Sequence, residues 1–69
     1  MERSKRLYKK FAELLDKTGK TAYKVSKDTG ISTATLSSWK AGDYTPKIDK
    51  LKILADYFGV PIEYFLGEV

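Results

Sequence analysis

The chain has 69 residues, enough for one domain with a small core, and a net charge of +4 from 13 Lys and Arg against nine Asp and Glu. It contains no Cys and no His, which excludes disulfides, thiolate metal ligands and the usual zinc sites. No apolar run reaches the roughly 18 residues of a membrane span, and the basic start lacks the apolar stretch of a signal peptide. We therefore expect one cytoplasmic domain over residues 1–69, with no metal, no cofactor and no membrane contact.

The basic charge is concentrated at the N-terminus. Residues 1–10 carry five Lys and Arg against one Glu, which gives a local charge of +4. Such an excess attracts polyanions such as nucleic acids, and it is equally typical of a solubilising helix face. Charge alone leaves both interpretations open.

Two helices are predicted before residue 30. The apolar residues of the first recur at spacings of three and four, which places them on one face: Leu7, Phe11, Leu14 and Leu15. Gly19 ends this helix, since glycine tolerates the left-handed conformation of a helix end. Thr21 has the hydroxyl of an N-cap and begins a short second helix, which Gly30 ends.

Three further helical segments follow. One begins at the cap residue Ser32, runs to about Ala41 and ends at Gly42, with Leu36 and Trp39 facing inward.

The next segment has Pro46 in its first turn, where the missing N–H is not needed. Its inward stripe comprises five residues: Ile48, Leu51, Leu54, Ala55 and Phe58. Gly59 ends it, and Pro61 opens a last turn in which Phe65 and Leu66 face inward. No strand pattern appears, so the sequence predicts an all-α fold of five helices joined by short loops.

Residues 21–41 carry the pattern of a helix-turn-helix unit. Its first helix needs an apolar residue followed by a small one, and Val25 and Ser26 supply them. Its turn needs a glycine, because the backbone conformation there excludes most side chains, and Gly30 is present. Three apolar residues then fix the angle of the second helix: Ile31, Leu36 and Trp39.

With this unit, the Thr45-Pro46 pair and the turn at residues 58–60, the chain resembles the DNA-binding domains of phage repressor and Cro-type transcription regulators, the XRE-like family. The resemblance covers roughly residues 5–67. It implies a five-helix lambda-repressor-like fold with the helix-turn-helix at the second and third helices. It also implies sequence-specific binding of double-stranded DNA by a transcriptional regulator, a repressor rather than an enzyme.

The resemblance places the third helix in the major groove, where its early exposed residues meet base edges. These expected base-reading residues are Thr33, Ala34, Ser37 and Ser38. Their hydroxyls donate or accept hydrogen bonds, and Ala34 and the threonine methyls suit a thymine methyl. The alternative is that these Ser and Thr residues only solvate an exposed face, and Thr35 only supports the Ser32 cap.

Phosphate contacts are expected on both flanks of this helix, because they supply most of the affinity and little of the sequence information. The expected residues are Thr21, Ala22, Lys24, Ser32, Lys40, Tyr44 and Lys47. Lys47 stands where the fourth helix begins, so that N–H groups there can receive a phosphate. For each Lys the alternative is an ordinary surface charge.

Two positions depart from the family. Many members have a phosphate-binding glutamine where this chain has Ala22, so that this contact is lost or replaced by Lys24. Many also pair an arginine of the first helix with a glutamate late in the third, at the positions of Leu15 and Lys40. Because both partners are absent together, we expect no buried charge without a partner, and Lys40 is free to face the DNA backbone.

Relatives bind DNA as two-fold pairs, because one recognition helix reads only a few base pairs, so we expect a homodimer at least on DNA. The expected contact is the last turn, at Pro61, Ile62 and Tyr64. Alternatively, Ile62 packs inward and the pair forms only on DNA. Ile53 and Tyr57, which share a helix face, are the next candidates for a subunit contact.

Other functions remain as alternatives. An enzyme is poorly supported, since there is no His or Cys, no Gly-rich phosphate loop and no informative carboxylate pair. An antitoxin-type autoregulator has the same sequence pattern. A helical protein-interaction module with this fold is the third possibility, and the salt dependence of binding separates it from a DNA-binding protein.

Overall fold

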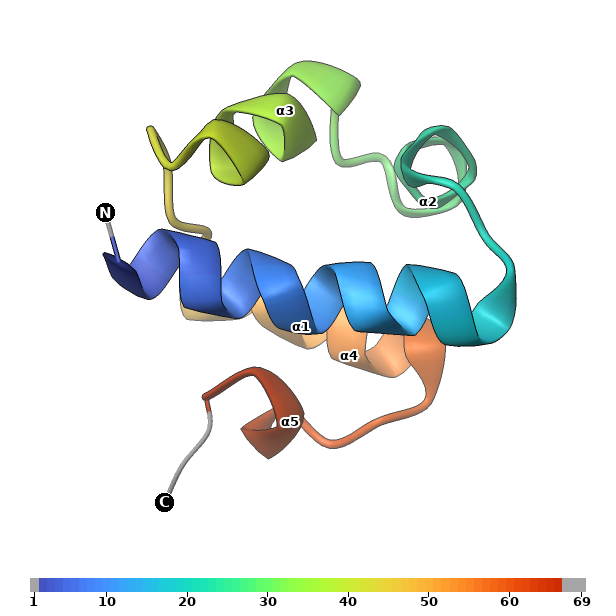
Figure 1. Ribbon diagram of the computed structural model, residues 1–69. Coiled ribbons are helices and arrows are strands. Elements are labelled where there is room, and N and C mark those ends of the chain that lie inside the picture. Colours follow the sequence, from blue (N-terminus) through green and yellow to red (C-terminus); the bar gives the residue numbers. More distant parts are fainter. Residues whose placement is uncertain (1, 67–69) are drawn as a thin grey trace.

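Five α-helices make up the secondary structure of residues 2–66, the residues that the computed structural model describes. They are α1 (Glu2–Thr18), α2 (Ala22–Thr29), α3 (Thr33–Ala41), α4 (Ile48–Phe58) and α5 (Glu63–Leu66). In Figure 1, α1 crosses the middle of the molecule, with α2 and α3 on one side and α4 and α5 on the other. No strand occurs within residues 2–66, and the predicted all-α fold is confirmed.

The helices of the predicted helix-turn-helix begin and end where the capping residues indicated. The hydroxyls of Thr21 and Ser32 each accept a hydrogen bond of 3.1 Å from the backbone N–H three residues further on. Gly30 and Gly42 end the two helices with φ angles of 82° and 88°, in the left-handed region that favours glycine.

Trp39 lies at the centre of the core and is fully buried. Its ring is surrounded by rings from α1 and α5, with centroid distances of 5.3 Å to Tyr8, 5.1 Å to Phe11 and 6.4 Å to Phe65. The other buried apolar residues of the core are Leu7, Leu14, Val25, Ile31, Leu36, Leu51, Leu54 and Ala55. Trp39 is therefore a packing residue, because its ring has no face free for a ligand.

Two side chains predicted to face inward are exposed. Ile48 is 62% exposed, because α4 begins at that residue and its first turn lies beyond the edge of the core. Leu66 is 41% exposed, since Phe65 takes the inward position of α5 and the next residue points about 100° away.

The start of α4 also differs from the prediction. Pro46 is buried but precedes the helix, with Lys47 as the N-cap, so the predicted place of Pro46 in the first helical turn is wrong.

None of the helices within residues 2–66 has the length and apolar character needed to cross a bilayer.

Candidate nucleic-acid interface

The predicted helix-turn-helix is present in the structure as α2, the turn at residues 30–32, and α3. Val25, Ile31 and Leu36 are buried between the two helices and the rest of the core. The hydroxyl of Thr29 donates to the Val25 carbonyl (2.7 Å) and accepts from the Ile31 N–H (3.3 Å). The turn is thus fixed by side-chain hydrogen bonds as well as by Gly30. Because α3 packs mainly against α1 and α2, its remaining face is left uncovered (Figure 1).

That uncovered face carries the residues predicted to read bases. Thr33, Ala34 and Ser37 are exposed, and Ser38 is half-buried beside them. Within residues 2–66, the hydroxyls of Thr33, Ser37 and Ser38 have no hydrogen-bond partner. The structure thus brings together four short side chains, three of which carry an uncommitted hydroxyl.

The hydroxyls of Ser32 and Thr35 are used differently. They lie 2.8 Å apart and hydrogen-bond to each other, and the Ser32 hydroxyl also accepts from the Thr35 N–H. This confirms that Thr35 supports the cap of α3. The Ser32 hydroxyl is therefore already used by the cap, and the predicted phosphate contact of Ser32 would have to use the same group.

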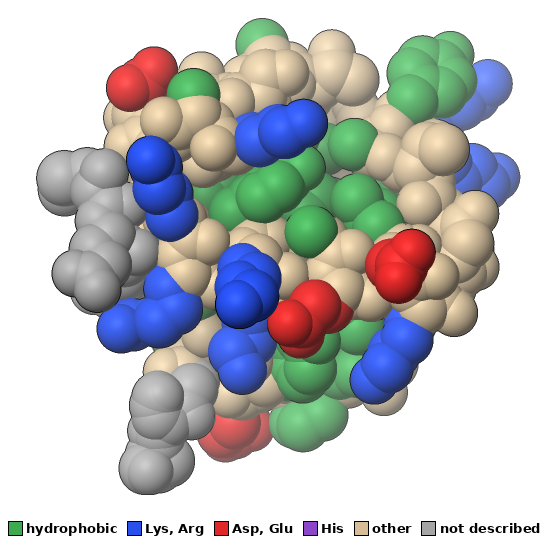
Figure 2. Space-filling view, viewed as in Figure 1, with side chains coloured by type: hydrophobic (Ala, Val, Ile, Leu, Met, Phe, Trp, Pro, Cys, Tyr) green, Lys and Arg blue, Asp and Glu red, His purple; other side chains and the backbone are tan. Residues whose placement is uncertain are grey.

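A hollow lies on each side of α3, so that the helix stands out as a ridge. One hollow, of about 170 Å³, lies toward α1 and is lined by Tyr8, Ala22, Thr33, Leu36, Ser37 and Lys40. The other, of about 220 Å³, is lined by Ala34, Thr35, Ser38, Asp43 and Tyr44. Figure 2 shows hydrophobic side chains between α3 and α1, with Lys and Arg side chains over the N-terminal half of α1.

The predicted phosphate-binding residues lie around this ridge and differ in how exposed their side chains are. Thr21, Lys24, Lys40 and Lys47 are exposed, whereas Ala22 and Tyr44 are half-buried. Lys24 lies 3.5 Å from the carboxylate of Asp28, which offsets part of its charge.

The N-terminus of α4 is also partly occupied. The side chain of Lys47, its N-cap, makes no cap hydrogen bond, but Asp49 accepts from the Lys50 N–H at 2.9 Å. An anion arriving at this helix end would meet the Asp49 carboxylate. The exposed ammonium of Lys47 is therefore a more favourable partner for a phosphate than the backbone N–H groups at the start of α4.

Ser4 is a positioning residue that the sequence interpretation missed. Its side chain is fully buried, and its hydroxyl donates to the Tyr44 carbonyl (2.6 Å) and lies 3.3 Å from the Trp39 carbonyl. In return the Trp39 indole N–H donates to the Ser4 carbonyl at 3.1 Å. These bonds hold the end of α3 and the loop after it against α1. The available signal was the position of Ser4 three residues before Leu7, on the same helix face.

A second long-range side-chain hydrogen bond joins α2 to α4. The hydroxyl of Tyr57 donates to the Asp28 carboxylate at 2.5 Å, and the Lys20 ammonium lies 5.4 Å from the Tyr57 ring centroid. The hydrogen bond from Tyr57, with help from Lys24, holds the pKa of Asp28 below its ordinary value. The same bond raises the pKa of Tyr57. Tyr57, predicted as a second candidate for a subunit contact, is thus engaged within the domain.

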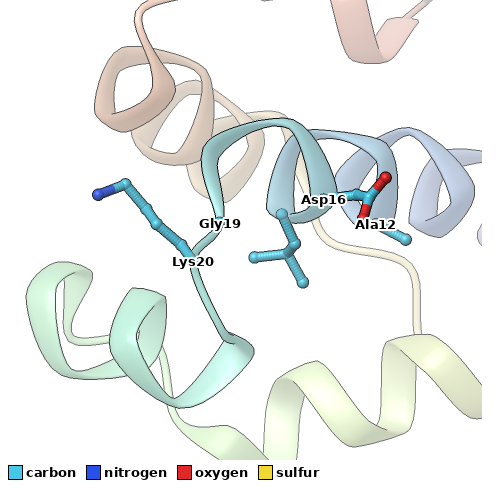
Figure 3. A pocket seen from close by; sticks show the side chains of 5 residues that line it. Ala12, Asp16, Gly19 and Lys20 are labelled. Atoms are coloured by element: carbon cyan, nitrogen blue, oxygen red, sulfur yellow. The ribbon is translucent and has the colours of Figure 1, made fainter.

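Figure 3 shows a further hollow, where α1 ends and the chain turns toward α2. It has a volume of about 390 Å³ and is lined by Ala12, Leu15, Asp16, Gly19 and Lys20. The Lys20 side chain extends away from Asp16, and a single carboxylate offers neither an acid–base pair nor a metal site.

Leu15 and Lys40 occupy the positions where many family members have a charged pair. Leu15 is half-buried and Lys40 is exposed. Among the described residues, every buried side-chain nitrogen or oxygen has a hydrogen-bond partner. The expectation that the loss of both charges leaves no buried charge unpaired is confirmed.

The family model described as helix-turn-helix matches residues 9–65. The match covers most of the chain, which therefore belongs to the Cro/C1-type, XRE-like helix-turn-helix family. No curated protein and no solved structure matches the chain. At the level of this family the protein is a DNA-binding transcription regulator, and the family is regulatory and not typically enzymatic.

The bonds of Ser4 predict a measurable cost of removing its hydroxyl. Ser4→Ala leaves the Tyr44 carbonyl without its donor, and an unsatisfied buried group costs about 1–3 kcal/mol of unfolding free energy. Urea unfolding followed by circular dichroism measures this loss. Ser37→Ala removes an exposed hydroxyl that has no partner within residues 2–66, and it should change stability by much less. Equal effects of the two substitutions would show that Ser4 does not hold the loop.

The bond between Tyr57 and Asp28 predicts a pH dependence of stability. Because it lowers the folded-state pKa of Asp28, its stabilisation is present above the ordinary pKa of 3.8 and is lost as the pH falls through the lowered value. At the alkaline end, the raised pKa of Tyr57 keeps the contribution intact below pH 10.0, and it is lost as the pH rises through the raised value.

Unfolding free energies of the wild type and Tyr57→Phe from neutral pH down to about pH 2 test this dependence. The difference between them should shrink at the acid end, whereas Tyr23→Phe, at a side chain 68% exposed, should show no such trend. A Tyr57→Phe difference that is constant with pH would contradict the assignment.

Proposed function

We propose that the protein is a transcriptional repressor that recognises a specific DNA site by placing α3 in the major groove. The observation that carries this proposal is the uncovered face of α3, where Thr33, Ser37 and Ser38 present uncommitted hydroxyls and Ala34 presents a methyl group. A major groove of about 12 Å width admits a helix, and the ridge with a hollow on each side suits such an entry. The DNA-binding function of the family supports the same proposal.

Phosphate contacts on the two flanks would hold α3 in register. The Thr21 hydroxyl accepts from the Lys24 N–H and keeps its own proton for a phosphate oxygen. The Lys40 side chain borders the hollow toward α1, and Lys47 follows the loop that bears Tyr44. We assign the principal phosphate contacts to Thr21, Lys40 and Lys47, with weaker roles for Ala22, Lys24, Ser32 and Tyr44.

We also propose that two copies bind together on a two-fold symmetric site in the cytoplasm. Pro61 is exposed and Ile62 is half-buried at the start of the last turn, so both present apolar surface at one end of the domain. The hydroxyl of Tyr64 lies 3.4 Å from both the Lys10 carbonyl and the Glu13 carboxylate, so this ring serves mainly to hold α5 on α1. A contact this small would form chiefly on DNA, which holds both subunits at high local concentration.

The salt dependence of binding tests the DNA-binding proposal. The logarithm of affinity for duplex DNA should fall linearly with the logarithm of salt concentration, by roughly 0.9 for each phosphate neutralised. Lys47→Ala should weaken binding to all duplexes alike and reduce the slope by about one unit. Lys52→Ala is the matched control, since Lys52 is exposed on α4 and paired with Asp56. Binding that is absent at low salt, or that salt does not weaken, would favour a protein partner instead.

The proposed pairing predicts a loss of cooperativity. Ile62→Lys should reduce cooperative binding to a palindromic duplex while sparing binding to a single half-site, because only the subunit contact is removed. Gel-shift titrations of the two duplexes measure this. Ile53→Lys, at the exposed isoleucine of the next candidate surface, is the comparison, and a loss of cooperativity from that variant instead would place the subunit contact on α4. Equal losses on both duplexes would assign Ile62 to the core of its own subunit.

A further inference from the structure

We propose that this protein selects its DNA site chiefly by thymine methyl groups, which contact the methyl groups of Thr33 and Ala34. The expected target is a half-site with thymines facing the first turn of α3. This inference rests on the proposed entry of α3 into the major groove, and it specifies which chemical feature of the DNA is read there.

The chain lacks most of the side chains that distinguish bases by paired hydrogen bonds. It contains no Asn and no Gln, the residue types that bind adenine with two bonds. Its two arginines, Arg3 and Arg6, precede the middle of α1, and the charged residue of α3 is Lys40 in the last turn. The first two turns of α3 therefore offer neither an amide nor a charge for guanine or adenine.

The hydroxyls on α3 add affinity without strong discrimination. Thr33, Ser37 and Ser38 have hydroxyls without a partner in the described part of the chain. A hydroxyl both donates and accepts, so it can satisfy a donor or an acceptor on any base edge. The hydroxyls of Ser32 and Thr35 are already bonded to each other. Polar contacts from α3 are thus permissive toward sequence.

Methyl groups are the remaining source of discrimination. Thymine alone among the four bases presents an apolar group, its C5-methyl, in the major groove. Thr33 and Ala34 are the first two residues of α3, and both are exposed. The first residues of a recognition helix are the ones that meet base edges. Because all four side chains on this face are short, the backbone of α3 can approach the bases closely enough for methyl contacts.

The size of the effect follows from the area of one methyl group. Removing one buried methyl from a contact lowers a binding constant roughly fourfold. Two independent contacts in each half-site multiply, so that the methyl groups together give a clear preference for thymine without any charged or amide side chain on the reading face.

The test uses duplexes that the protein itself selects from a random library. Each selected duplex is resynthesised with deoxyuridine in place of thymidine at one position at a time, which removes the C5-methyl and leaves base pairing intact. At one or two positions of each half-site the affinity should fall roughly fourfold. Elsewhere, the same replacement should have little effect.

Matched variants assign each methyl contact to a residue. Thr33→Ser removes the methyl and keeps the hydroxyl, so it should abolish the loss at one thymine position. Thr33→Val keeps a methyl and removes the hydroxyl, and it should preserve that loss. Ala34→Gly should abolish the loss at the neighbouring position and leave the Thr33 position unchanged.

Two results would overturn the inference while leaving DNA binding in place. One is equal affinity for the thymidine and deoxyuridine duplexes at every position. The other is a larger loss from 7-deazaguanine at selected guanines, which would assign the reading to hydrogen bonds with guanine N7, from a hydroxyl of α3 or from Lys40, and not to methyl contacts. If no duplex is enriched and binding is insensitive to salt, the proposed function fails and the inference fails with it.

Discussion

The position of α3 depends on how the indole of Trp39 is held. Its ring is buried among rings of α1 and α5, and its N–H donates to the Ser4 carbonyl. The Ser4 hydroxyl in turn binds the backbone just beyond α3. Apolar packing holds α3 against α1, and these hydrogen bonds hold the end of α3 and the loop that follows it. The inner side of α3 is thereby fully used for structure, and the outer side is left for a ligand.

The uncovered face differs in chemistry from the faces that surround it. The Lys and Arg side chains of the domain lie mainly on α1, α2 and α4 and in the loops, with Lys40 in the last turn of α3, whereas the middle of the ridge is small, polar and methyl-bearing. Phosphate attraction and base discrimination are thus assigned to different residues. On the proposed function, this division would let a chain without Asn or Gln distinguish DNA sequences.

Local signals predicted much of the fold. The caps at Thr21 and Ser32, the glycine ends at Gly30 and Gly42, and the burial of Trp39 all follow from short-range patterns, and the structure confirms them. Helical periodicity also predicted which face of each helix is apolar. It did not predict where the core ends, because periodicity continues past the last neighbouring helix, and Ile48 and Leu66 were misplaced for that reason.

The side-chain hydrogen bonds between distant elements were not predictable from such local patterns. Ser4 and Trp39 are 35 residues apart, and Asp28 and Tyr57 are 29 apart, so neither bond leaves a local pattern. The predicted base-reading residues lie together on one face because they share a single helix turn or neighbouring turns. The predicted phosphate contacts come from α2, α3 and the loops beside them, so their arrangement in space depends on how these elements pack. The ion pair between Lys24 and Asp28 is different, since it joins residues four apart on one helix and is a local pattern.

The contacts of Trp39 also bear on how the domain is made. Ser4 belongs to the first helix and Phe65 to the last, yet both contact the same indole. Much of the order of α3 therefore depends on nearly the whole domain being present, as in a cooperative all-or-none transition. During synthesis, a chain whose last helix has not yet left the ribosome lacks the Phe65 ring, which packs on one side of the Trp39 indole. The order of the uncovered face of α3 is thus coupled to completion of the fold, so a partly made domain is not expected to bind DNA as a weaker version of the whole one.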